Sequence, residues 1–140
     1  MKLVTGLGLD GLDIDWEYPK DETQANNLVD LLCEVRSALQ ASSQVDPGEA
    51  EYLLTVAAPA GPKDYEKLKI KEMDQYLDFW NIMAYDFAGG WEQTTGHSAN
   101  LYSSTQNPES TKFSADTAIK YYASQGVRKD KLVLGMPLYG

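Results

Sequence analysis

Four short apolar runs alternate with segments of helical or polar character, and this alternation limits the folds that the chain can adopt. The runs are GLDIDW at 11–16, YLLTVAAPAGP at 52–62, DFWNIMAYDF at 78–87 and KLVLGMPLYG at 131–140. Runs of this length, rich in branched and aromatic residues, are typical of β-strands. Strands that alternate with helices pair in parallel through right-handed crossovers. The sequence therefore predicts an α/β fold with a parallel sheet.

Two of the segments between these runs have the periodicity of helices. Apolar residues recur at helical spacing from about Glu22 to Gln40 and predict a helix, which a loop at 41–51 follows. Ser114 is expected to cap a further helix that ends at Gly126, because glycine is favoured in the position after a helix.

The other two segments are less regular. Residues 63–77 are only loosely periodic and predict one or two short helices. Residues 88–112 show almost no periodicity and predict a long loop. Long loops inside compact domains are usually functional.

The pattern fits two architectures, half of an eight-stranded α/β barrel or a small open sheet. In both, the C-terminal ends of the strands carry the chemistry. The stretches DIDWE, AAPAG, MAYD and GMPLYG all lie at such ends. We therefore expect the functional residues among them.

Carboxylates occupy alternate positions of the first strand. Since side chains on a strand alternate between its faces, Asp13, Asp15 and Glu17 share one face, each about 6 to 7 Å from the next. Three charged carboxylates so close together repel one another, so at least one is expected to hold a proton at neutral pH. Glu17, at the open rim, is the natural general acid, and Asp15 either shares a proton with Asp13 or faces a substrate. Asp10 lies on the other face and is expected to be structural.

Two other interpretations of the acidic face exist. Alternate acidic residues are common on the solvated face of an antiparallel strand, but the neighbouring runs indicate an enclosed parallel sheet, where polar tracts usually serve a site. Aspartates also bind Mg²⁺ or Ca²⁺. Alternate strand residues do not form the looped cage that such ions prefer, so we expect no metal.

Further candidates follow the third strand. Tyr85 and Asp86 can hydrogen-bond an uncharged polar group of a substrate, although each also fits an ordinary structural role. Trp91, in the long loop, is the candidate for an exposed aromatic platform, with a role in anchoring the loop as the alternative. Trp16 and Trp80 are expected in the core.

Composition narrows the class of partner. Acidic residues outnumber basic ones by 21 to 12, and the net charge of −9 excludes a phosphate backbone or an anionic membrane surface as the partner. A neutral or weakly polar partner fits better.

Cys33 is the only cysteine, so no internal disulfide can form, and we expect it to be buried. His97, the only histidine, is expected at the surface or in a hydrogen bond. We see no export signal and no run of membrane-spanning length.

The two polar stretches together resemble a known family. DGLDIDWEYP resembles the D-x-x-D-x-D-x-E signature on the fourth barrel strand of the family 18 glycoside hydrolases, the chitinases. MAYD, at Met83 to Asp86, resembles that family's M-x-Y-D motif on the sixth strand. LTVAAPAGP, YDFAGGWEQTTGHSANLY and GMPLYG are similar to secreted fungal chitinases in particular. The resemblance implies a partial (β/α)8 barrel, about strands four to seven with their helices.

The resemblance also implies roles for the site residues. Glu17 corresponds to the acid that protonates the glycosidic oxygen and later activates water. Asp15 corresponds to the residue that orients the substrate's 2-acetamido group, whose carbonyl oxygen attacks the anomeric carbon, and Asp13 to the partner that shares its proton. Tyr85 and Asp86 match the residues that hold the acetamido group, with Met83 and Trp91 as further substrate contacts. No cofactor is implied, because the substrate supplies its own nucleophile.

The implied activity is hydrolysis of the β-1,4 bonds of chitin or chito-oligosaccharides with retention. An endo-β-N-acetylglucosaminidase and a non-catalytic chitin-binding lectin of the same fold are the alternatives. Residues 1–140 are expected to be part of one catalytic domain truncated at both ends, with MKLV the end of a preceding helix. We expect the complete protein to be an extracellular monomer, and the 140-residue chain alone to be unstable and inactive.

Overall fold

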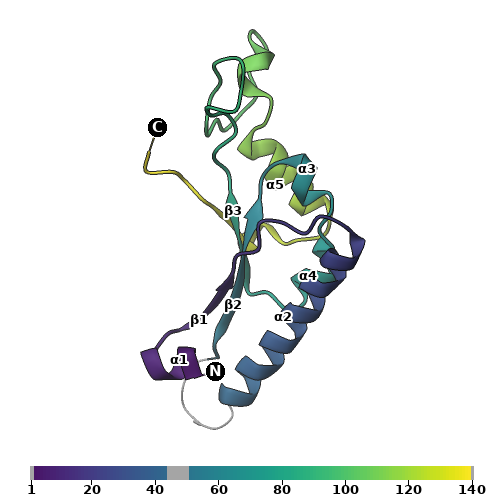
Figure 1. The fold of residues 1–140 in the computed structure, drawn as a ribbon, viewed down its shortest axis with the longest axis vertical. Coiled ribbons are helices and arrows are strands. Elements are labelled where there is room, and N and C mark those ends of the chain that lie inside the picture. The colour runs from purple at the N-terminus through teal and green to yellow at the C-terminus, as the bar shows by residue number, and fades with distance from the viewer. Residues whose placement is uncertain (1, 44–50, 140) are drawn as a thin grey trace.

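A four-stranded parallel sheet organises the structure, a computed structural model that describes residues 2–43 and 51–139 (Figure 1). The strands lie side by side in the order of the sequence and all run in the same direction. They are β1 Gly11–Ile14, β2 Leu53–Pro59, β3 Phe79–Met83 and β4 Leu132–Leu134. The predicted α/β fold with a parallel sheet is confirmed. Each strand is shorter than its apolar run, because backbone pairing lasts only where neighbouring strands stay in register.

The helices occupy the predicted segments. They are α1 Lys2–Leu7, α2 Glu22–Ser43, α3 Pro62–Tyr65, α4 Ile70–Asp74 and α5 Ala115–Ser124, with short 3-10 turns at Pro108–Thr111 and Lys129–Lys131. The prediction that α2 ends near Gln40 was wrong by one turn, since residues 41–43 continue the helix. The rest of the loop predicted there, residues 44–50, lies outside the described residues. No helix in the described ranges has both the length and the apolar character that a membrane span requires.

Local capping explains the bounds of α5. The Ser114 hydroxyl accepts a hydrogen bond from the backbone N–H of Thr117, which satisfies one of the free donors in the first turn. After the helix, Gly126 adopts a φ of 101°, a left-handed conformation that costs glycine little. Both features were predicted from sequence.

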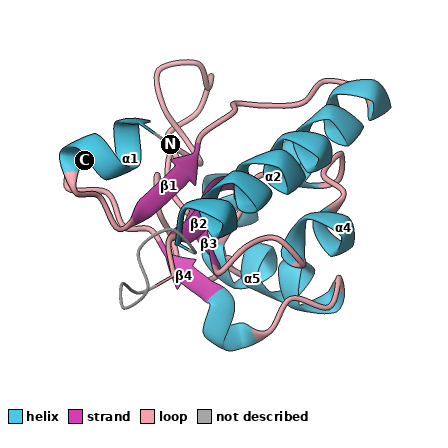
Figure 2. Cartoon of the chain, turned by 90° about the horizontal axis from the view of Figure 1, so that it is seen from below, coloured by secondary structure: helices cyan, strands magenta, loops and turns pink. Residues whose placement is uncertain are grey.

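One face of the sheet is covered by helices. Figure 2 shows α2, α4 and α5 on the same side of the strands. Alternate strand residues point into this layer and are buried, among them Leu54, Val56, Trp80 and Ile82. The Trp80 side chain is fully buried, as predicted, and its indole N–H donates to Asp74 Oδ1 at 2.9 Å. This covered face contains the hydrophobic core.

Two core predictions need correction. Trp16 packs against the core but stays partly exposed, because it lies beyond Ile14, where β1 ends. Cys33 is likewise half-buried rather than enclosed.

The N-terminal end of the sheet is fastened by an arginine. Arg36, on α2, donates from Nε to the carbonyl oxygen of Tyr76 at 2.8 Å and from Nη1 to that of Tyr52 at 3.0 Å. Its Nη2 lies 2.5 Å from Asp78 Oδ2, which also accepts the backbone N–H of Leu54 at 2.7 Å. These bonds fix α2 to the starts of β2 and β3, at the end of the sheet remote from the polar clusters.

Candidate active site

The segments that follow β1, β2 and β3 enclose a cleft of about 530 Å³ at the C-terminal ends of the strands. The long loop after β3 rises beyond these ends (Figure 1). Of the predicted site residues, the cleft brings together Asp15, Glu17, Met83, Tyr85, Asp86 and Trp91. Its remaining lining residues are Tyr18, Pro59, Ala60, Gly61, Lys63, Asp64, Phe87 and Phe113.

The acidic face of the first strand is built as its alternation predicts. Asp13, Asp15 and Glu17 are exposed, whereas the residues between them are half-buried against the core side. Strand pairing ends at Ile14, so Asp15 and Glu17 stand on the extended segment beyond β1, where they reach the cleft. The peptide bond between Glu17 and Tyr18 is cis. Asp10 is exposed, and it contributes its backbone carbonyl, which accepts the N–H of Leu53 at 2.8 Å.

Asp13 lies one level below the cleft, on the open face of the sheet. Its Oδ1 accepts hydrogen bonds from the hydroxyl of Thr55 on β2 and from Nδ2 of Asn81 on β3, the latter at 3.0 Å. Two neutral donors therefore hold the Asp13 carboxylate in place. The sharing of a proton between Asp13 and Asp15 stays a prediction.

Tyr18 is a site residue that the sequence reasoning missed. Its burial raises the pKa of the Tyr18 phenol well above the ordinary value, and the adjacent Glu17 carboxylate raises it further. A phenol is already protonated at neutral pH, and the raised pKa keeps the Tyr18 hydroxyl available as a hydrogen-bond donor in the cleft at higher pH as well. In the sequence, the signal that could have identified Tyr18 is its position directly after Glu17.

Tyr139 is the second missed residue. Its hydroxyl donates to Asp86 Oδ1 at 2.8 Å, and its ring meets that of Tyr85 edge to face, with centroids 6.5 Å apart. Asp86 has a φ of 55°, in the left-handed region that a non-glycine residue seldom adopts. The hydrogen bond to Asp86 raises the pKa of Tyr139, so this donor keeps its proton to a higher pH than a free phenol does.

A glycine allows this approach of β4 to β3. A Cβ on Gly135 would lie 2.8 Å from the carbonyl oxygen of Ile82 and 3.0 Å from the Tyr85 ring. The Gly135 N–H instead donates to the Ile82 carbonyl at 2.8 Å. The close fit extends the pairing of the two strands and brings Tyr139 within reach of Asp86.

Trp91 stands at the rim of the cleft with 68% of its surface exposed. The indole ring lies over Gly89, where a Cβ would be only 2.4 Å from the ring. The predicted exposed aromatic residue is therefore present beside the carboxylates.

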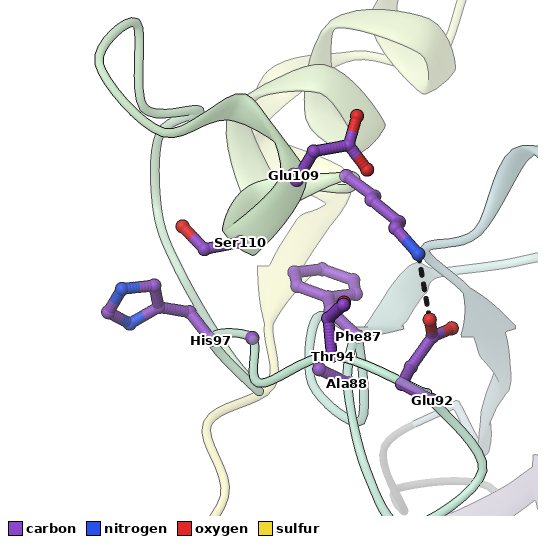
Figure 3. Close-up of a pocket in the computed structure, with 9 residues that line it drawn as sticks. Phe87, Ala88, Glu92, Thr94, His97, Glu109 and Ser110 are labelled. Carbon is purple, nitrogen blue, oxygen red and sulfur yellow. Dashed lines mark hydrogen bonds and ion pairs between the residues drawn. The ribbon is translucent and has the colours of Figure 1, made fainter.

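His97 is exposed in the same loop, and its ring points away from the small pocket beside it (Figure 3).

The whole chain, residues 1–140, matches the model of the glycosyl hydrolases family 18. The chain belongs to this family. It is 51% identical over 133 residues to Chitinase 1 of Aphanocladium album, a match that covers 95% of this chain and 31% of that protein. The chain spans about a third of the length of the curated relatives that it matches, 31% and 32% for the first two.

Solved structures of family 18 proteins have the same fold. The chitinase ChiA74 from Bacillus thuringiensis is 40% identical with a TM-score of 0.88, over 96% of this chain and 23% of that one. The class V chitinase from Nicotiana tobaccum, solved as a mutant in complex with NAG4, is 34% identical with a TM-score of 0.84, over 97% of this chain and 38% of that one. The sheet and its helices are therefore part of a family 18 (β/α)8 barrel, as the resemblance implied.

Proposed function

We propose that the protein containing this chain is a chitinase that hydrolyses β-1,4 bonds between N-acetylglucosamine units with retention of configuration. The observation that carries the proposal is the cleft, in which Glu17 at the rim faces the same space as Asp15, Tyr85 and Asp86. A carboxyl acid and a set of acetamido-binding groups are what a substrate-assisted mechanism needs. The names of the similar proteins support the same activity.

The proposed reaction has two steps. In the first, the Glu17 carboxyl gives its proton to the glycosidic oxygen while the acetamido carbonyl oxygen of the same sugar forms a bond to the anomeric carbon, and the leaving sugar departs. In the second, the Glu17 carboxylate takes a proton from water, whose oxygen attacks the anomeric carbon and opens the oxazolinium ring. Two inversions at one carbon give net retention. Asp15 accepts the acetamido N–H and stabilises the charge of the intermediate.

The other residues hold the substrate. Tyr85 and Asp86 line the same cleft as the segment after β1 and are suited to hydrogen-bond the acetamido group, while Met83 lines the space beneath. Trp91 offers its exposed face to a sugar ring, a contact that aromatic side chains make well because of their flat apolar surface. Asp13, fixed by its two donors, shares a proton with Asp15 as the intermediate forms.

We also infer that residues 1–140 are part of one catalytic domain, because the family match covers the chain without a break. The net charge of −9 suits an uncharged polysaccharide. We further propose that the complete enzyme is extracellular, monomeric and without a cofactor. The 140-residue chain alone is expected to be unstable and inactive, because it leaves large apolar side chains exposed on its strands, such as Leu53, Val133 and Leu134.

The test is Glu17→Gln in the complete protein. We expect kcat on chito-oligosaccharides to fall by about 10²- to 10⁴-fold, the usual contribution of general acid catalysis, while binding persists. Glu34→Gln, an exposed position on α2, is the matched control and should be fully active.

Each other outcome has a definite meaning. Undiminished hydrolysis by Glu17→Gln means that the acid is misassigned. A wild-type protein that binds chito-oligosaccharides without cleaving them is the lectin. Release of N-glycans with chitin untouched identifies the endo-β-N-acetylglucosaminidase.

A further inference from the structure

The long loop between β3 and α5 contributes an aromatic side chain to the cleft from each of its two stems. Trp91 lies on the outgoing stem and Phe113 on the returning stem, and both line the cleft. Their neighbours in sequence, Glu92 and Lys112, form an ion pair behind them, with Nζ and Oε2 2.8 Å apart. The dashed line in Figure 3 marks this contact. One charged link therefore connects the backbone segments that carry the two aromatic residues.

The orientation of Trp91 has little other support from side-chain packing. Its indole is largely exposed and lies over Gly89, in a turn closed by the hydrogen bond from Glu92 N–H to the Gly89 carbonyl at 3.0 Å. The residue that closes the turn is thus the residue that pairs with Lys112. The Glu92 carboxylate therefore ties this turn to the returning stem.

The returning stem, in contrast, is held firmly. Asn100 Nδ2 donates to the Phe113 carbonyl at 2.7 Å, and the first N–H of α5, on Ala115, donates to the Asn100 carbonyl at 3.1 Å. Phe113 also packs against the buried Phe87. The backbone next to Lys112 is therefore held in place, and the Trp91 turn is attached to it through the ion pair.

The ion pair is also partly shielded. It borders a pocket of about 10 Å³, room for roughly one water molecule, between the two stems. Side-chain exposure is 25% for Glu92 and 42% for Lys112, so solvent weakens the attraction without removing it. Among the residues that the structure describes, no other ion pair joins the two stems of this loop.

We propose that Glu92 and Lys112 are a positioning pair that sets the spacing of the Trp91 and Phe113 side chains and thereby the affinity of the cleft for a sugar chain. The identity of that chain rests on the proposed function. Neither residue touches the reacting bond, so the pair acts on binding and leaves the chemical step alone. Higher ionic strength should weaken the same affinity, because salt screens a partly exposed pair.

The experiment compares Glu92→Gln with a charge reversal, Glu92→Lys combined with Lys112→Glu, in the complete protein. The control is Asp116→Asn, which breaks an ion pair of similar length, 2.7 Å to Lys120, on α5 outside the cleft. Two kinds of measurement are made. The first gives KM and kcat on chito-oligosaccharides, and the second is the fluorine NMR resonance of fluorotryptophan at Trp91, assigned with Trp91→Phe and recorded in the absence of substrate.

We expect Glu92→Gln to raise KM about two- to fivefold at unchanged kcat, the range of a partly exposed ion pair, and to shift or broaden the Trp91 resonance. The charge reversal should return both KM and the Trp91 resonance to their wild-type values. An unchanged resonance in Glu92→Gln, or an equal change in Asp116→Asn, overturns the proposal. Because the resonance is recorded without substrate, it decides whether the pair positions Trp91 even if the protein does not hydrolyse chitin.

Discussion

Replacing Arg36 by Met should destabilise the protein more than the same change at an exposed arginine. The Arg36 side chain is only 14% exposed and makes three hydrogen bonds, to the carbonyls of Tyr76 and Tyr52 and to the carboxylate of Asp78. Met keeps most of the aliphatic stem in place, so the change isolates the guanidinium. It removes one donor from each of two carbonyls and from the Asp78 carboxylate.

The size of the effect follows from these contacts. A hydrogen bond to a charged group contributes about 1.5 to 3 kcal/mol, so three bonds set an upper limit of about 9 kcal/mol. Asp78 is 38% exposed and keeps its bond from the Leu54 N–H, so water and that donor recover part of the loss. We therefore expect the free energy of unfolding to fall by about 2 to 4 kcal/mol. The free energy of unfolding of Arg36→Lys should lie between those of the wild type and of Arg36→Met, because lysine keeps the charge and loses the planar guanidinium.

The assay is urea unfolding of the complete protein, with the midpoint as the measured quantity. The matched control is Arg128→Met, because Arg128 pairs with Asp130 at the surface, where the two side chains are 74% and 62% exposed. Its midpoint should equal that of the wild type. If Arg36→Met also unfolds at the wild-type midpoint, the reasoning that α2 is fastened to the sheet through this guanidinium is refuted.

The remaining predictions concern two tyrosines. Tyr122→Phe removes a buried hydroxyl that donates to the Pro59 carbonyl at 2.8 Å and should cost about 1 kcal/mol at neutral pH. Burial raises the pKa of Tyr122 well above its ordinary value, so above about pH 10 the unfolded chain loses this proton first and the free energy of unfolding falls as pH rises. Urea unfolding across this pH range should show a smaller fall in Tyr122→Phe than in the wild type. An equal fall in the two proteins contradicts the assignment. Tyr139→Phe keeps the ring contact with Tyr85 and loses the donor to Asp86, so kcat/KM on chito-oligosaccharides should fall about tenfold, the equivalent of one hydrogen bond. Wild-type kinetics in that variant would show that Asp86 needs no such partner.

Features that depend on near neighbours in the chain could be predicted. The cap at Ser114 and the left-handed glycine at 126 follow from the conformational limits of single residues. The exposed faces of Asp13 and Asp15 follow from the two-residue repeat of a strand. In each case the physical cause lies within a few residues, so the sequence contains the whole signal.

Other features depend on residues that meet only in the folded chain. Tyr139 reaches Asp86 across 53 positions, and no local pattern marks that contact. The same holds for the Glu92–Lys112 pair, which joins two ends of a loop without periodicity, and for the half-burial of Trp16, which depends on the strand pairing of β1 ending at Ile14.

The sequence by itself determined the parallel α/β order, the helix caps and the row of carboxylates, because strand and helix periods and residue conformations act locally. It also indicated the family through two motifs. Only the tertiary structure decided which side chains share the cleft, that Thr55 and Asn81 hold Asp13, and that Tyr18 and Tyr139 join the site. Those contacts depend on strand register and loop closure, which bring distant segments to the same end of the sheet.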